Sequence, residues 1–148
     1  MKKIVIFDLD GTLALIDDRR KISTKPNGKM DWDKFFDPKN INLDKPNIPV
    51  IKMAQLLAST DHQIVIFSGR SDVTIHTTKS WLNKHKVPFD IIKMRPVKDF
   101  TPDDVLKQNW LNVIGKDNVL CTFDDRNKVV DMWRQNGIDC FQVADGNF

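Results

Sequence analysis

The sequence is poor in cysteine and has neither a long apolar run nor a block of basic residues. Its two cysteines, Cys121 and Cys140, lie in apolar, strand-like segments, so we expect buried free thiols instead of a disulfide or a metal site. No apolar stretch approaches the roughly 20 residues of a membrane span. The apolar start, MKKIVIFD, is too short for a signal peptide. We therefore expect no membrane association and a cytoplasmic location.

Composition and charge describe an ordinary globular protein. The 148 residues suffice for one domain, residues 1–148, that buries about two-thirds of its unfolded surface. Lysine and arginine number 23 against 20 aspartate and glutamate, which gives a formal charge of +3. This small excess is compatible with phosphorylated substrates and does not demand nucleic acid. We find no internal repeat or low-complexity tract, and no protein partner is evident.

Alternating apolar segments and helical patterns predict the fold class. Segments rich in Ile, Val and Phe, without polar alternation, are typical of parallel strands buried on both faces. They cover residues 3–7, 63–67, 90–94, 119–123 and 139–143. Apolar residues recur at helical spacing over residues 50–57, 75–82, 105–113 and 128–133. The alternation predicts an α/β fold, a doubly wound sheet of about five parallel strands, with ligands beyond the carboxyl ends of the strands.

The segment 15–47 interrupts this alternation. It is polar, contains three prolines and shows no sustained periodicity. Trp32, Phe35 and Phe36 provide a small apolar anchor, and DWDKFF is compatible with one helical turn or more. A long insertion directly after the first strand favours a small cap or lid over a functional site. For Trp32 two interpretations stay open, an anchor for the lid or a ring that stacks on a substrate base.

Carboxylates follow two of the predicted strands. Asp8 and Asp10 come after the first strand, and Asp124 and Asp125 come after the fourth. The carboxyl ends of parallel strands face one crevice, so these side chains gather there and repel one another unless a cation binds. Oxygen ligands without nearby His or Cys favour magnesium, Mg2+, over zinc. The sequence therefore predicts a magnesium site among these four residues.

The second strand delivers a segment suited to phosphate. The Ser68 hydroxyl, with nearby backbone amides, is expected to hold phosphoryl oxygens, and Gly69 lets the backbone approach closely. Arg70 follows at the same edge. Lys107, on the predicted helix after PDD, is expected to neutralise a further oxygen, with Lys98 as the alternative lysine.

The pair Asp8 and Asp10 suits phosphoryl transfer. With a cation, a lysine and amides close by, Asp8 can attack phosphorus as a nucleophile and form an aspartyl-phosphate. Asp10 then acts as general acid for the leaving alcohol and later as base for water. Two carboxylates are needed because one group cannot be nucleophile and proton carrier at once.

Four motifs now carry a family resemblance. D-L-D-G-T at 8–12, F-S-G-R at 67–70, a downstream lysine and F-D-D-R at 123–126 resemble, in order, the motifs of the haloacid dehalogenase (HAD) superfamily. The second aspartate, Asp10, resembles the phosphatase branch of that superfamily. The resemblance implies a Rossmann-like core, Mg2+, and Asp8 as the phosphorylated residue.

Two longer stretches are similar to the 3′-phosphatase domain of bacteriophage polynucleotide kinase-phosphatase. They are MRPVKDFTPDDVLK and FDDRNKVVDMWRQNGIDCFQVADGNF. The similarity implies that Asp125 is the metal ligand with Asp124 in support, and that Asp10 also gives its backbone carbonyl to the metal. Ser68 and Lys107 are implied phosphate ligands. A phage or prophage origin is the corresponding expectation.

The same similarity implies roles for three further residues. Arg70 and Arg19 resemble arginines needed for activity, and Arg20 is the alternative to Arg19 because the segment 15–47 matches poorly. Asp103 resembles an acidic residue that orients the lysine or an arginine, and capping of the helix after Pro102 is the alternative. No G-x-x-x-x-G-K-[ST] motif occurs, so no kinase site is expected in these residues.

The leading hypothesis is a Mg2+-dependent phosphomonoesterase that acts on a 3′-phosphate at a nucleic-acid end or on a nucleotide. A second hypothesis keeps the chemistry and changes the substrate to a small metabolite or a 5′-mononucleotide. A third is a non-catalytic protein that binds a phosphorylated ligand. The intact pair Asp8 and Asp10 argues against the third, because binding alone needs no proton carrier.

Overall fold

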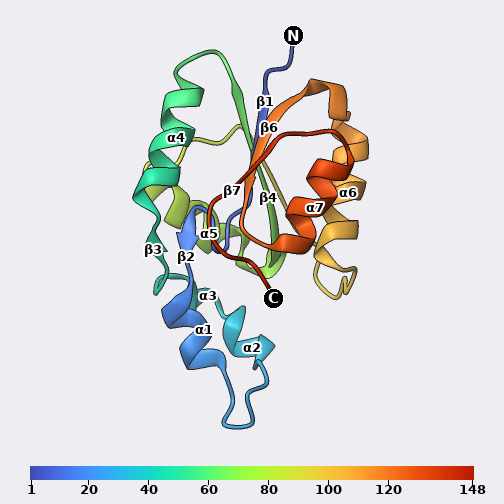
Figure 1. The fold of residues 1–148 in the computed structure, drawn as a ribbon. Helices are drawn as coiled ribbons and strands as arrows, with labels where there is room; N and C mark the ends of the chain where they lie inside the picture. The colour runs from blue at the N-terminus through green and yellow to red at the C-terminus, as the bar shows by residue number, and fades with distance from the viewer.

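Five parallel strands form the central sheet of the computed structural model, which describes residues 1–148 (Figure 1). Their order across the sheet is β5-β4-β1-β6-β7. The strands are β1 (Ile4–Phe7), β4 (Gln63–Ser71), β5 (Ile91–Arg95), β6 (Val119–Asp124) and β7 (Cys140–Gln142). The prediction of a doubly wound α/β fold with about five parallel strands is confirmed.

Two helices cover each face of the sheet. α4 (Ile48–Ala58) and α5 (Ile75–Lys84) lie on one face, and α6 (Asp103–Ile114) and α7 (Asn127–Gln135) lie on the other. In β1, Val5 and Phe7 join the core under α4 and α5, whereas Ile6 joins the core under α6 and α7. Both sides of each central strand are buried, which explains the continuous apolar runs of the sequence. No helix is long and apolar enough for a membrane span.

The element bounds differ little from the prediction, with one exception. β4 continues through Ser68 to Ser71, beyond the predicted end at residue 67, and its register with β5 shifts between Ser68 and Ser71. Residues 68–71 are mostly polar and extend no apolar run, so the predicted strand was too short at its carboxyl end. Two 3-10 helices, Asp72–Thr74 and Lys116–Asn118, complete the core, and both cysteines are free and buried as predicted.

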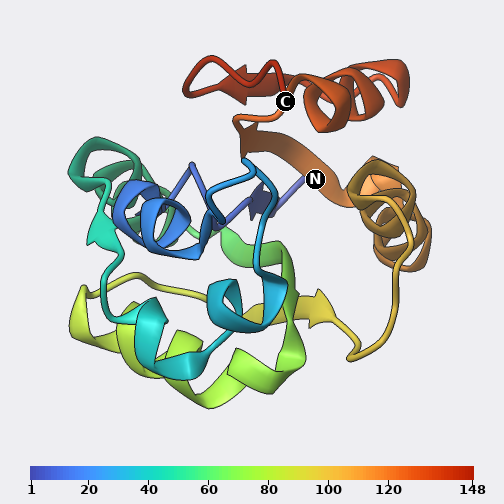
Figure 2. The ribbon, with the colours of Figure 1, turned by 90° about the horizontal axis from the view of Figure 1, so that it is seen from below.

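The segment 15–47, which we call the insert, has more regular structure than its polar sequence indicated. It contains α1 (Asp17–Ser23), α2 (Trp32–Phe35) and α3 (Pro38–Ile41). The strand β2 (Ala14–Leu15) at its start pairs antiparallel with β3 (Lys45–Pro46) at its end. α1 was not predicted because DDRRKIS lacks apolar periodicity, although its acidic first turn and basic last turn suit a helix. Seen from below, the insert lies across the carboxyl ends of the strands (Figure 2).

Candidate active site

A buried cluster of carboxylates lies where β1 and β6 end. Because these strands are parallel neighbours, Asp8 comes to lie beside Asp124 and Asp125, and one oxygen of each lies within 4.8 Å of the others. All three residues are buried. Burial, together with the charge of Asp124, raises the pKa of Asp8 well above its usual value, although Lys107 opposes this shift. The cluster has oxygen ligands only and an unfavourable concentration of negative charge, as a hard cation site requires.

Lys107 of α6 points into this cluster. Its Nζ donates to Asp8 Oδ1 at 2.8 Å and to Asp124 Oδ2 at 3.1 Å. Burial alone would lower the pKa of Lys107, but the charges of Asp124 and Asp8 more than offset burial, so its pKa is raised and the ammonium stays charged. Lys98 is exposed, so the structure brings Lys107 to the site and not the alternative lysine.

The two adjacent aspartates differ in what their oxygens contact. Asp124 Oδ1 accepts from the backbone N–H of Asp125 at 2.9 Å, and its Oδ2 accepts from Lys107 and, at 3.2 Å, from Trp133 Nε1. Asp125 Oδ1 receives only a long hydrogen bond, 3.4 Å, from Thr12 Oγ1, and its Oδ2 receives none. Asp125 therefore has a carboxylate oxygen without a hydrogen bond, whereas both carboxylate oxygens of Asp124 accept hydrogen bonds.

Asp10, two residues after Asp8, contacts two buried arginines. Its Oδ1 accepts from Arg19 Nη2 at 2.8 Å and from Arg70 Nε at 2.7 Å, while Oδ2 has no hydrogen bond. Burial raises the pKa of Asp10, but the charges of Arg70 and Arg19 outweigh burial and leave its pKa below the usual value. The side chain of Asp10 is therefore outside the carboxylate cluster, and its free oxygen is available for proton transfer.

Asp44, which the sequence analysis missed, holds both of these arginines. Its carboxylate accepts from Arg19 Nε and Nη2, both at 3.0 Å, and from Arg70 Nη2 at 2.7 Å. Burial raises the pKa of Asp44 to about 6, against the opposing charges of Arg70 and Arg19. A single aspartate in NLDKPN carries no sequence signal of this role.

Both arginines, which the sequence analysis gave as needed for activity, are buried and bound to protein groups. Arg19 and Arg70 are 0% and 1% exposed, and their remaining donors contact Phe35 O at 3.3 Å and Thr78 Oγ1 at 3.1 Å. With their donors engaged inside the protein, they are placed to orient Asp10. Arg20, the alternative to Arg19, is exposed and does not contact Asp10.

Ser68 and Gly69 lie at the end of β4, at the same edge of the sheet. Ser68 is buried, and its Oγ accepts from Arg70 N at 3.1 Å. A Cβ on Gly69 would lie 2.7 Å from Asp103 Oδ1. A side chain at this position would therefore make the Asp103 carboxylate move.

Asp103 joins two arginines at the rim of the site. Its carboxylate accepts from Arg95 Nη2 and, at 2.9 Å, from Arg126 Nη1. Arg95 also donates to Gly69 O at 2.9 Å, which fixes the end of β4. The side chain of Asp103 therefore orients arginines, and the alternative helix cap is not formed. Arg95 and Arg126 were missed as site residues, although both lie inside the quoted motifs MRP and FDDR.

Several solved structures of low sequence identity share this fold. A predicted phosphatase from Clostridium acetobutylicum matches with a TM-score of 0.75 at 15% identity, over 96% of this chain and 84% of that chain. A haloacid dehalogenase-like hydrolase from Streptococcus pneumoniae matches with a TM-score of 0.65 at 16% identity, over 95% of this chain and 84% of that chain. Fold, motifs and site together define a phosphatase of the HAD class.

Within the HAD class, the chain can be assigned to one family. Residues 2–148 match the family described as the polynucleotide kinase PNKP phosphatase domain, and the chain belongs to that family. A chain of the Pnkp1/Rnl/Hen1 complex is 30% identical, with a TM-score of 0.83, over 100% of this chain and 48% of that chain. A protein of Autographa californica nuclear polyhedrosis virus, described as a bifunctional polynucleotide kinase/RNA ligase, is 35% identical over 140 residues, 89% of this chain and 18% of the viral protein. This chain thus spans less than half the length of either relative.

Proposed function

We propose that the chain is a Mg2+-dependent phosphomonoesterase that removes a 3′-phosphate from a nucleic-acid end through an aspartyl-phosphate at Asp8. One observation carries this proposal. Asp8 lies between the ammonium of Lys107, 2.8 Å away, and the free oxygen of Asp125 in a buried cluster. A nucleophile, a positive charge for the phosphoryl oxygens and a metal ligand thus meet at one point.

The residues present fit a magnesium ion. Asp125 Oδ2 accepts no hydrogen bond, and Asp8 Oδ2 accepts one neutral hydrogen bond, from Thr12 Oγ1 at 3.1 Å, so each carboxylate can offer an oxygen to an ion. The backbone carbonyl of Asp10 is the third expected ligand. Lys107 neutralises only one of the three clustered carboxylates, so negative charge remains for a divalent cation. When bound, the ion would neutralise phosphoryl oxygens and help to hold the phosphate in place.

The first step transfers the phosphoryl group to the protein. A carboxylate oxygen of Asp8 attacks phosphorus, and the bond between phosphorus and the 3′-oxygen of the substrate breaks. Lys107 neutralises charge on the phosphoryl oxygens, and Ser68 is the expected hydrogen-bond partner for one of them. Asp10 donates the proton that the leaving 3′-oxygen takes up. Its pKa rises when the negative phosphate binds nearby, which favours the protonated acid for this step.

The second step releases phosphate. Asp10, now a carboxylate, takes a proton from water, and the water oxygen attacks phosphorus while the bond between phosphorus and Asp8 breaks. Asp8 returns to its original form and inorganic phosphate leaves. Arg19 and Arg70 favour the ionised form of Asp10 through their contacts at 2.8 and 2.7 Å, which supports its role as base.

Three observations support a nucleic-acid end as the substrate. The family comprises phosphatase domains of polynucleotide kinases, and a similar solved complex is described as an RNA repair complex. The rim of the site carries Arg95 and Arg126 against the single carboxylate of Asp103, a positive balance that suits a substrate with further phosphates. We also propose that the insert is a lid, because it supplies both Arg19 and Asp44 to the site.

Phosphate release in the presence of Mg2+ tests this function. The substrates are a 3′-phosphorylated oligonucleotide, its 5′-phosphorylated twin, 3′- and 5′-mononucleotides and several sugar phosphates, with Asp8→Asn as the blank. We expect the 3′-phosphorylated strand to give the highest kcat/KM. A preference for sugar phosphates or 5′-mononucleotides would overturn the substrate assignment and leave the chemistry intact. The cytoplasmic location and the phage origin stay predictions.

A further inference from the structure

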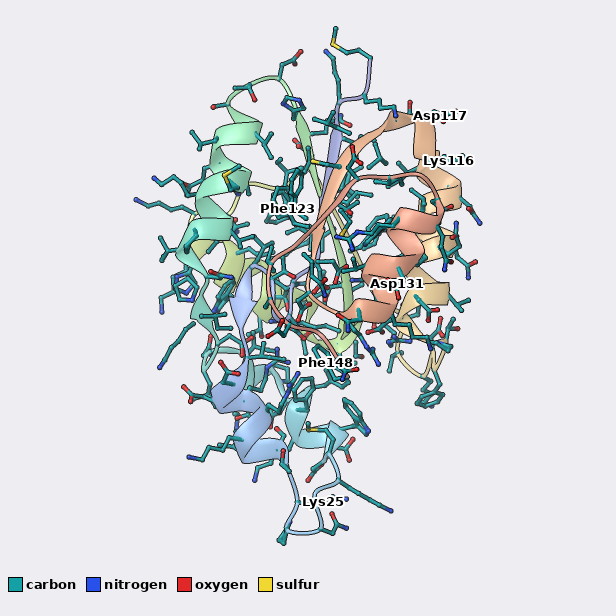
Figure 3. All side chains as sticks on the ribbon, viewed as in Figure 1. Lys25, Lys116, Asp117, Phe123, Asp131 and Phe148 are labelled. Carbon is teal, nitrogen blue, oxygen red and sulfur yellow. The ribbon has the colours of Figure 1, made fainter.

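An exposed aromatic ring stands beside the site, between two arginines. Phe148 is 56% exposed and belongs to neither apolar core. The guanidinium carbon of Arg20, in α1 of the insert, lies 5.2 Å from the centre of its ring, and that of Arg126 lies 5.6 Å away. Figure 3 places Phe148 at the lower end of the sheet, next to the insert. The ring therefore lies between the insert and the rim of the site.

The backbone of residues 143–148 is fixed to the loop that carries Asp125. Val143 N donates to Asp124 O at 3.0 Å, and Asn127 N donates to Gly146 O at 2.9 Å. A Cβ on Gly146 would collide with the backbone carbonyl of Asp125, so only glycine allows the segment to lie so close. The position of Phe148 is thus tied to the predicted metal ligand.

The two arginines beside the ring differ in their freedom. Arg126 donates to Phe148 O at 2.9 Å and to Asp103 Oδ2 at 2.9 Å, so its guanidinium is held in place. Arg20 is exposed and forms no hydrogen bond or ion pair through its side chain, and its guanidinium lies over the ring. An unpaired, exposed cation next to a fixed ring can move aside when a flat ligand covers the ring.

We propose that Phe148 is a specificity-determining residue that stacks on the base of the terminal nucleotide, with Arg20 as the partner of the neighbouring phosphodiester. This inference rests on the proposed function, because only a nucleic-acid end presents a base and a second phosphate beside the reacting one. A buried anchoring role does not account for a ring that is 56% exposed and outside both cores. Stacking requires an exposed π face and tolerates every base.

Two substrates test the stacking directly. Both are 3′-phosphorylated strands of identical sequence, one with a normal terminal nucleoside and one with an abasic terminal sugar. We expect the unaltered chain to favour the base-bearing strand by about tenfold in kcat/KM, the factor that one stacked base supplies. Phe148→Leu should lower this ratio to near unity, because leucine has no π face, and Phe148→Trp should restore it. Arg20→Gln should weaken binding of both strands and reduce the dependence of KM on salt.

Phe141→Leu is the matched control. Phe141 is also 56% exposed, but it stacks on Phe123 at 5.2 Å and contacts neither arginine. This variant should keep the preference for the base-bearing strand. An equal loss of kcat/KM on both strands in Phe148→Leu would show a structural role of the segment and overturn the proposal. An active unaltered chain without preference between the strands would overturn it as well, whereas inactivity on both strands would overturn the proposed function together with this inference.

Discussion

Asp10 and Asp44 share the same two guanidinium groups. Arg19 donates to Asp10 at 2.8 Å and to Asp44 at 3.0 Å, and Arg70 donates to each carboxylate at 2.7 Å. Asp10 follows β1 in the core, whereas Asp44 comes from the insert. The orientation of the proposed proton carrier thus depends on a residue outside the core. This relationship ties the insert to the chemistry.

Removal of Asp44 should therefore reduce turnover without touching the reacting atoms. In Asp44→Ala the buried arginines lose a partner, and breaking a buried ion pair costs about 3–5 kcal/mol in free energy of unfolding. We expect kcat to fall by about a hundredfold, because a displaced acid-base group costs roughly that factor. Steady-state kinetics and urea unfolding measure the two effects. Asp33→Ala, an exposed acid of the insert, is the control, and full activity of Asp44→Ala would contradict the positioning role.

Substitution of Asp10 by asparagine should separate binding from catalysis. In Asp10→Asn the amide keeps the shape of the side chain but carries no proton between the two steps, so turnover should fall by about a hundredfold or more. Binding of a 3′-phosphorylated strand, measured by fluorescence anisotropy with Mg2+ present, should change by less than about threefold because the phosphate contacts remain. A parallel loss of binding would place Asp10 among the phosphate ligands.

The two adjacent aspartates should respond differently to magnesium. For the unaltered chain we expect saturating Mg2+ to raise the melting temperature by about 5 °C, the effect of a ligand that binds only the folded state. Asp125→Asn should abolish this shift, since it changes the oxygen that is free for the ion. Asp124→Asn should lower the melting temperature even without metal, because its oxygens accept hydrogen bonds from Lys107 and Trp133. The reverse pattern would assign the ligand to Asp124.

The thiols should be unreactive in the folded protein. Burial is the main cause that raises the pKa values of Cys121 and Cys140 to about 11. Both thiols therefore stay neutral at pH 8. Their burial in the neutral form contributes to the free energy of unfolding below pH ~9, and this contribution is lost as the pH rises toward 11. Ellman's reagent at pH 8 should react with neither thiol in native buffer and with both in urea. Rapid reaction of one thiol in native buffer would show local opening of β6 or β7.

The part of the site that the sequence predicts is the part encoded by short local patterns. Asp8, Asp10, Asp124 and Asp125 each follow an apolar strand segment, and parallel pairing then brings these segments to one edge. The choice between Lys107 and Lys98, in contrast, needs the structure, because the sequence pattern does not show which lysine points into the site. Both are single lysines near the same helix, but one is buried and the other exposed.

The parts that escape prediction depend on contacts between distant segments. Asp44 gains its role from Arg70, which lies 26 positions away and in another element. α1 has no apolar stripe, because its two buried residues are the charged Arg19 and the polar Ser23. Trp32 packs edge-on against Phe35 at 5.6 Å and stacks on Phe36 at 5.8 Å, as an anchor does, yet it stays 60% exposed. The aromatic contacts and the ion pairs of the insert follow no periodic sequence pattern, so they could not be predicted from the sequence.

Detection of the phosphoryl group on Asp8 is the most direct test of the mechanism. The protein is mixed with a radiolabelled 3′-phosphorylated strand and Mg2+, quenched in acid within milliseconds, digested and analysed by mass spectrometry. We expect acid-stable label on the peptide that contains Asp8, sensitive to hydroxylamine and absent from Asp8→Asn. Steady turnover by Asp8→Asn, or label on another residue, would contradict it.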